Sequence, residues 1–173
     1  MDKKKFANKK QLLTNLLQLS VSSDDPKNLS KQNRCYAKLK KGLCPSTRWY
    51  AYEVIQKYGG NIYSLEDITI AGLFATYDNN IPHGGNIGAL WAKIVKKRKT
   101  LGKTSSLFHF NRLLDCKDSE ELCTRLIPLI RYAKSVSIPI DYEKLYQDLT
   151  QFSKRREEII RNWAHGYWSN END

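Results

Sequence analysis

The side chains that could do chemistry in this sequence do not form a recognisable catalytic set. Residues 84–88 are rich in glycine and precede a helical pattern, but their spacing matches neither G-x-G-x-x-G nor a Walker loop. We interpret these glycines as a tight turn with close helix packing. His83 and His165 have no motif partner, and residues 118–121 place their acids where a helix start favours them. No nucleophile, base and orienting group come together, which predicts a protein without enzymatic activity.

The four cysteines give no indication of a metal site. They stand at positions 35, 44, 116 and 123, without a C-x-x-C pair and far from the three histidines in sequence. Zinc sites usually show tighter ligand spacing. We therefore expect reduced thiols, no metal and no other cofactor.

The charge of the chain is strongly positive and unevenly distributed. With 29 Lys+Arg against 18 Asp+Glu among 173 residues, the net charge is +11. Basic residues gather between positions 31 and 57 and between 93 and 103, whereas residues 58–92 contain none. Such clustering favours a polyanionic partner, either nucleic acid or an anionic membrane surface.

One basic cluster belongs to a helix that also carries an apolar stripe. The stripe has a 3.6-residue period and consists of Ile87, Leu90, Trp91, Ile94 and Val95. Asn86 is a suitable N-cap, and the cations follow on the other face and at the C-terminal end, where the helix dipole favours them. A solvated helix end and a binding surface are both compatible with this pattern.

The periodicity of the remaining sequence predicts an all-α protein of two small helical subdomains packed together, with a long C-terminal helix. The expected helices cover residues 6–20, 26–41, 45–58, 65–77, 107–114 and 142–168, and a further helix begins at residues 118–121. Expected caps are Asp25, Asp141 and Ser64, the last in a capping box with Asp67. Pro128 should kink its helix or end it at Ile127.

Other features of these helices bear on the core and on domain organisation. We expect Leu29 to face inward, and Arg156, on the apolar face of the last helix, either to snorkel out of the core or to contact a partner. Periodicity lapses at residues 100–104. This predicts an N-terminal basic arm and helix at 1–22, an N-terminal helical subdomain at 23–103 and a C-terminal helical bundle at 104–173.

Six segments in order resemble the small subunit, CasB, of the type I-E CRISPR Cascade complex. They are residues 34–42 (RCYAKLKKG), 73–77 (LFATY), 85–88 (GNIG), 110–114 (FNRLL), 140–149 (IDYEKLYQDL) and 161–167 (RNWAHGY). The resemblance extends from about residue 33 to residue 168. Phe108 and His109 stand where the family has paired arginines, so Arg112 becomes the candidate cation there.

The resemblance implies a two-part helical subunit of an RNA-guided surveillance complex, without catalytic activity of its own. It implies sequence-independent backbone contacts to crRNA and target DNA and to the displaced strand, which stabilise the R-loop in antiviral defence. The implied partners are the Cascade large subunit, the backbone subunits and a second copy of the chain, with no role for a membrane.

We expect three basic clusters to form one continuous face that contacts phosphates. The first cluster consists of Arg34, Lys38, Lys40, Lys41 and Arg48, the second of Lys93, Lys96, Lys97, Arg98 and Lys99, and the third of Lys154, Arg155, Arg156 and Arg161. Arg112 is a further candidate. Trp49, Tyr50 and Trp168 are either exposed for base stacking or packed in the core.

Two other functions are compatible with the sequence. A stand-alone helical DNA-binding regulator would need a recognition helix with base-reading side chains, whereas these clusters are lysine-rich and spread over several helices. A peripheral membrane or scaffold protein would use the basic residues within 3–10.

The chain has no apolar run of membrane-spanning length and no secretory signal pattern at its start, so we expect a cytoplasmic protein.

Overall fold

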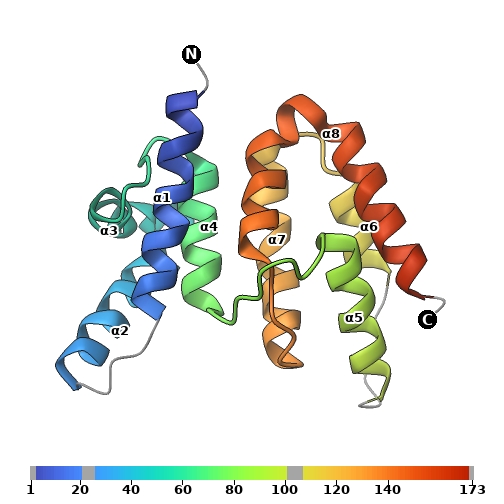
Figure 1. The fold of residues 1–173 in the computed structure, drawn as a ribbon, viewed down its shortest axis with the longest axis horizontal. Coiled ribbons are helices and arrows are strands. Elements are labelled where there is room, and N and C mark those ends of the chain that lie inside the picture. Colours follow the sequence, from blue (N-terminus) through green and yellow to red (C-terminus); the bar gives the residue numbers. More distant parts are fainter. Residues whose placement is uncertain (1–2, 21–25, 101–106, 172–173) are drawn as a thin grey trace. The chain divides into compact units, whose positions relative to one another are not determined.

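The computed structural model describes residues 3–20, 26–100 and 107–171. Within these ranges the regular structure is helical, apart from an isolated parallel bridge between Asn80 and Ile140 (Figure 1). The prediction of an all-α protein is therefore confirmed. The chain divides into two compact units, unit 1 at Met1–Asp78 and unit 2 at Asn79–Asp173.

Unit 1 is built around one almost entirely apolar helix. Its elements are α1 (Lys3–Ser20), α2 (Pro26–Lys41), the 3₁₀-helix η1 (Pro45–Ala51), α3 (Tyr52–Lys57) and α4 (Leu65–Thr76). α4 is buried along most of its length, and both α1 and α2 pack against it. The Ser64 hydroxyl caps α4 by accepting a hydrogen bond from Asp67 N (3.1 Å), as the spacing predicted.

Two details of unit 1 differ from the expected pattern. Leu29 is 49 % exposed, because the buried stripe of α2 begins one turn later, at Gln32. Pro45 opens a 3₁₀-helix rather than an α-helix, and α-geometry begins only at Tyr52. The expected cap Asp25 lies outside the described residues.

Unit 2 contains α5 (Ile87–Thr100), α6 (Phe108–Leu114), α7 (Ser119–Ser135) and α8 (Tyr142–Glu171). Its core is rich in aromatic rings, with Trp91, Phe110 and Trp163 fully buried. The indole N–H of Trp163 donates to the buried Asp148 carboxylate (2.7 Å), which satisfies a polar group that burial would otherwise make costly. α5 packs chiefly against α8.

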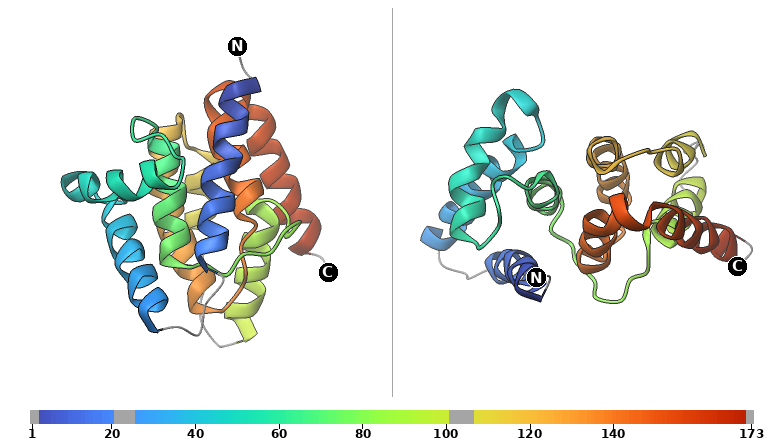
Figure 2. Two further views of the ribbon diagram at one scale, coloured as in Figure 1. Left: turned by 60° about the vertical axis from the view of Figure 1, so that its left-hand side comes forward. Right: turned by 90° about the horizontal axis from the view of Figure 1, so that it is seen from above.

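Two helices of unit 2 depart from the expected course. α7 continues through Pro128 to Ser135, so the alternative that it ends at Ile127 is wrong; the side chains of Leu126, Leu129 and Ile130 are buried around the proline and hold the helix together. α8 is long, as expected, but its backbone leaves helical geometry at Arg155 (φ −129°, ψ 31°). The two arms of α8 therefore run in different directions (Figure 2).

The division into units also differs from the expected boundary between residues 103 and 104. That boundary placed α5 with the preceding helices, whereas α5 belongs to unit 2. The expected linker beyond Thr100 lies outside the described residues. α5 joins unit 2 because its apolar face packs on α8, a contact between distant segments that periodicity alone does not reveal.

Candidate nucleic-acid interface

α5 is held against α8 by a contact that only glycine permits. A Cβ atom on Gly88 would lie 1.7 Å from the carbonyl oxygen of Trp163, so the two backbones touch at this point. Asn86 Oδ1 accepts from Ala89 N (3.0 Å) and caps the helix, while Asn86 Nδ2 donates to the Asn162 carbonyl oxygen (2.8 Å). The glycine-rich segment thus fixes where α5 begins and how it lies on α8.

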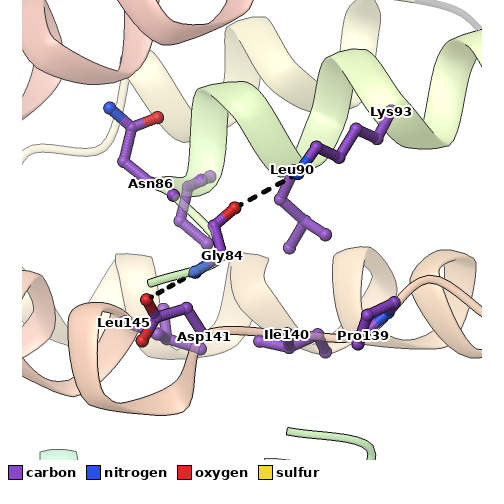
Figure 3. A pocket seen from close by; sticks show the side chains of 10 residues that line it. Gly84, Asn86, Leu90, Lys93, Pro139, Ile140, Asp141 and Leu145 are labelled. Carbon is purple, nitrogen blue, oxygen red and sulfur yellow. Dashed lines mark hydrogen bonds between the residues drawn. The ribbon is translucent and has the colours of Figure 1, made fainter. Parts of the chain in front are cut away.

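The loop before α5 is tied to the start of α8. Gly84 N donates to the Asp141 carboxylate (3.0 Å), whose other oxygen caps α8 by accepting from Lys144 N (2.8 Å). The Lys93 ammonium donates to the Gly84 carbonyl oxygen (3.3 Å) (Figure 3). The cavity between these residues measures about 10 Å³, which is room for one water molecule and not for an organic ligand.

The outer face of α5 carries lysines that have no carboxylate partner among the described residues. Its exposed lysines are Lys93, Lys96, Lys97 and Lys99. In the part of the chain that the structure describes, no carboxylate lies within ion-pair distance of any of them. The ammonium groups of Lys96, Lys97 and Lys99 therefore remain available to an external anion, whereas that of Lys93 also donates to the Gly84 carbonyl oxygen.

Arg98 and Arg112 differ from the lysines because aromatic rings hold them. The Arg98 guanidinium lies over the Tyr132 ring of α7 (4.7 Å to the centroid), and Arg112 lies over Phe108 (5.2 Å). The Tyr132 hydroxyl is in turn hydrogen-bonded to His109 (3.1 Å). Arg98 is half-buried and joins α5 to α7, whereas Arg112 is exposed.

The cations of unit 1 gather near the end of α2. Arg34, Lys40 and Lys41 are exposed, and none of them pairs with a carboxylate of the described residues. Lys38 instead forms an ion pair with Glu53, and its hydrogen bond and charge hold the pKa of that carboxyl below the ordinary value. Lys38 is therefore neutralised within the unit.

Two aromatic side chains lie beside these cations. The rings of Trp49 and Tyr50 are stacked, with centroids 3.7 Å apart, and the Lys41 ammonium lies 4.0 Å from the Tyr50 centroid. Trp49 is 60 % exposed, while Tyr50 is half-buried. Trp168, in unit 2, is 48 % exposed. Of the two alternatives left open by the sequence, exposure therefore applies to both tryptophans.

The third expected cluster, on α8, is largely engaged within the protein. Arg155 pairs with Glu158, which raises the pKa of the guanidinium, and Arg161 pairs with Glu157 (3.4 Å). Arg156 donates to the carbonyl oxygens of Cys116 (2.6 Å) and Leu114 (3.4 Å), and so binds backbone acceptors that the end of α6 leaves open. Lys154 is exposed and has no carboxylate partner among the described residues.

The expectation that the three clusters form one continuous face stays a prediction. The bend of α8 at Arg155 lies at one end of unit 2, and the C-terminal end of α5 lies at the other (Figures 1 and 2). The pairing on α8 had a signal in the sequence, since Arg155–Glu158 and Glu157–Arg161 stand at i,i+3 and i,i+4, the spacings at which helical side chains meet. The stack of Trp49 on Tyr50 had no such signal.

The described residues contain no group of three or more His, Cys, Asp or Glu side chains suited to a metal ion. Asp118, Glu120 and Glu121 lie close together, but they serve the start of α7, where Asp118 accepts from Glu121 N (2.8 Å). Among the helices that the structure describes, none has the length and apolar character needed to cross a bilayer.

Comparisons with solved structures find the same fold in other proteins. Two solved structures are similar over nearly the whole chain: TTHB189, a CRISPR-associated protein of the Cse2 family from Thermus thermophilus, with 18 % identity and a TM-score of 0.68, and CasB from M. ruber, with 16 % identity and a TM-score of 0.59. The first match covers 93 % of this chain and 97 % of TTHB189, and the second covers 94 % and 93 %. At these identities the matches establish a shared fold.

A comparison with curated protein sequences finds no match. The sequence profile of the family described as CRISPR-associated protein Cse2 matches residues 51–168, which is more than half of the chain. The matched range includes α5 and its contact with α8. The chain therefore belongs to the Cse2 family of CRISPR-associated proteins, the CasB small subunits of the type I-E Cascade complex.

Proposed function

We propose that this Cse2-family subunit binds sugar-phosphate backbones within Cascade and thereby stabilises the R-loop. The observation that carries the proposal is the face of α5, where Lys93, Lys96, Lys97 and Lys99 are exposed without carboxylate partners among the described residues. A cation that has no internal partner gains most from meeting a phosphate, since no existing ion pair has to be broken first.

The energetics of R-loop formation suit such weak contacts. Opening the target exchanges a DNA duplex for an RNA–DNA duplex of similar stability, so modest backbone contacts can decide the balance. The guide RNA recognises the target sequence by base pairing. A supporting subunit should therefore bind phosphates without base preference. Lysines on flexible stems meet this requirement, because each acts as a point charge.

The proposed nucleic-acid partners are crRNA, target DNA and the displaced strand. In unit 1, Arg34, Lys40, Lys41 and Arg48 join the α5 lysines as the main contacts, with Arg112 and Lys154 as further ones. We rank Lys38, Arg155, Arg156 and Arg161 lower, because each has a partner within the protein. The proposed protein partners are the large subunit, the backbone subunits and a second copy of this chain, and the subunit has no catalytic step of its own.

The test compares two variants in reconstituted Cascade. The α5 variant carries Lys96→Gln and Lys97→Gln, and the α8 control variant carries Arg155→Gln and Arg161→Gln, so each removes two positive charges. We expect the α5 variant to reduce opening of the target, measured by permanganate reactivity of the displaced strand, and the α8 control variant to leave it near wild type. Normal opening with a fully incorporated α5 variant would count against the proposal.

A further inference from the structure

The stack formed by Trp49 and Tyr50 is a feature that phosphate binding alone leaves unexplained. Trp49 is 60 % exposed although an indole gains substantially from burial. The Tyr50 ring covers one face of the indole at a centroid distance of 3.7 Å and an interplanar angle of 24°, so the half-buried tyrosine supports an indole that is largely open to solvent. Thr47 fixes η1 against the end of α2 by donating to the Lys41 carbonyl oxygen (2.8 Å).

One cation lies against this aromatic pair, and a second, half-buried one adjoins it in sequence. The Lys41 ammonium lies 4.0 Å from the Tyr50 centroid, and Arg48 directly precedes Trp49. Neither cation forms an ion pair with a carboxylate in the described ranges. A second exposed aromatic of unit 1, Tyr63, is 91 % exposed but stands in the stretch without lysine or arginine. Of these two exposed aromatic side chains of unit 1, Trp49 alone combines a stacked neighbour with nearby cations.

We propose that the Trp49–Tyr50 stack receives an unpaired nucleobase, while Lys41 and Arg48 bind the adjoining phosphates. This inference rests on the proposed function, because it assumes that nucleic acid reaches unit 1. Every base of RNA or DNA has a π-face that can stack on an aromatic ring, so such a contact does not depend on the base sequence. An apolar protein segment would match the rings but not the two cations, so the charge favours a nucleic acid strand.

The test separates stacking from phosphate binding with the full-length chain. A thymidine oligonucleotide is compared with an abasic sugar-phosphate oligomer of equal length and charge, and a uridine oligonucleotide provides the RNA arm. We expect the wild type to bind the base-containing strands roughly 5- to 150-fold more tightly than the abasic one. Trp49→Ala should remove this preference and keep the abasic affinity, Trp49→Phe should restore part of it, and the control Tyr63→Ala should leave it unchanged.

The outcomes distinguish this inference from the proposed function. Equal wild-type affinity for base-containing and abasic strands overturns the stacking inference but leaves phosphate binding intact. Failure to bind any of the strands overturns the proposed function, and the inference with it. If Trp49→Ala keeps the base preference but prevents incorporation into reconstituted Cascade, the ring contacts a protein and the inference is wrong. A larger loss on uridine than on thymidine identifies guide RNA as the source of the base, and the reverse identifies DNA.

Discussion

The salt dependence of binding should distinguish the cations of α5 from those of α8. We compare the α5 variant (Lys96→Gln, Lys97→Gln) with the α8 control variant (Arg155→Gln, Arg161→Gln), because both lose two positive charges. Glutamine and lysine have similar helix propensities, so the helices should persist. The lysines have no carboxylate partner among the described residues, whereas each arginine is already neutralised by a neighbouring glutamate.

The expected magnitude follows from counterion release. A plot of log K against log salt has a negative slope, and each lost phosphate contact makes it less steep by about 0.7 for a single strand and about 0.9 for duplex DNA. Two lost contacts reduce the steepness of this slope by about 1.4–1.8. At about 0.1 M salt this corresponds to a roughly 25- to 60-fold loss of affinity, or about 2 kcal/mol. The α8 control variant should change the slope by less than about 0.5, since its arginines release few counterions.

Fluorescence anisotropy of a labelled strand over a series of salt concentrations measures both slopes, and circular dichroism checks that each variant is folded. Equal slope losses in the two variants would refute the reasoning, because internal pairing would then have no bearing on binding.

A third variant, Lys96→Gln with Thr100→Lys, moves one lysine a helical turn along the same face. Its slope should match that of the wild type, since a phosphate backbone repeats along the strand.

Three further changes test the packing of unit 2. Gly88→Ala should lower the free energy of unfolding by about 3 kcal/mol in chemical denaturation, because its Cβ would meet the Trp163 carbonyl oxygen. Arg156→Gln should lower it by about 1–3 kcal/mol, since the Cys116 carbonyl oxygen loses a charged donor, and should leave the salt slope of binding unchanged. Burial raises the pKa of the Cys116 thiol to about 11, so at about pH 8 it stays protonated, and iodoacetamide should modify it only in denaturant, as followed by mass spectrometry.

Each of these results has a matched control. Ala89→Gly, one position from Gly88, should cost only about 1 kcal/mol through helix propensity, and a similar loss at both positions would contradict close backbone contact. A less steep salt dependence of binding in Arg156→Gln would mean that the Arg156 guanidinium binds phosphate. Native-state alkylation of Cys116 as fast as that of the exposed Cys44, whose pKa the Ser46 hydroxyl lowers, would contradict its burial.

Much of the fold could be predicted because helices are encoded locally. The stripe of α5, its Asn86 cap and the Ser64 cap of α4 each depend on residues within a few positions of one another. The bend of α8 at Arg155 could not be predicted in this way, because no proline or glycine marks it. The grouping of α5 with α8 depends on the contact of Gly88 with Trp163, which lies far along the chain.

The candidate site could be predicted only in part, for a related physical reason. Net charge and clustering identify which segments are basic, but binding depends on which cations remain unpaired after folding. Lys38 met Glu53 fifteen residues away, a distance at which sequence spacing says nothing about contact. Arg156 was recognised as unusual on an apolar face, yet its backbone acceptors belong to a different helix.

Gly88 and the α5 lysines differ in how precisely they must be placed, because they contact different kinds of groups. Gly88 meets a single backbone carbonyl at a fixed position, so even one added carbon is excluded. The α5 lysines would meet a phosphate chain that repeats every few ångströms and is surrounded by water, so a long flexible stem can reach one phosphate or the next. Under the proposed function, the helices must be placed exactingly but the charges only approximately, and a closely packed core beneath exposed lysines on α5 meets both requirements.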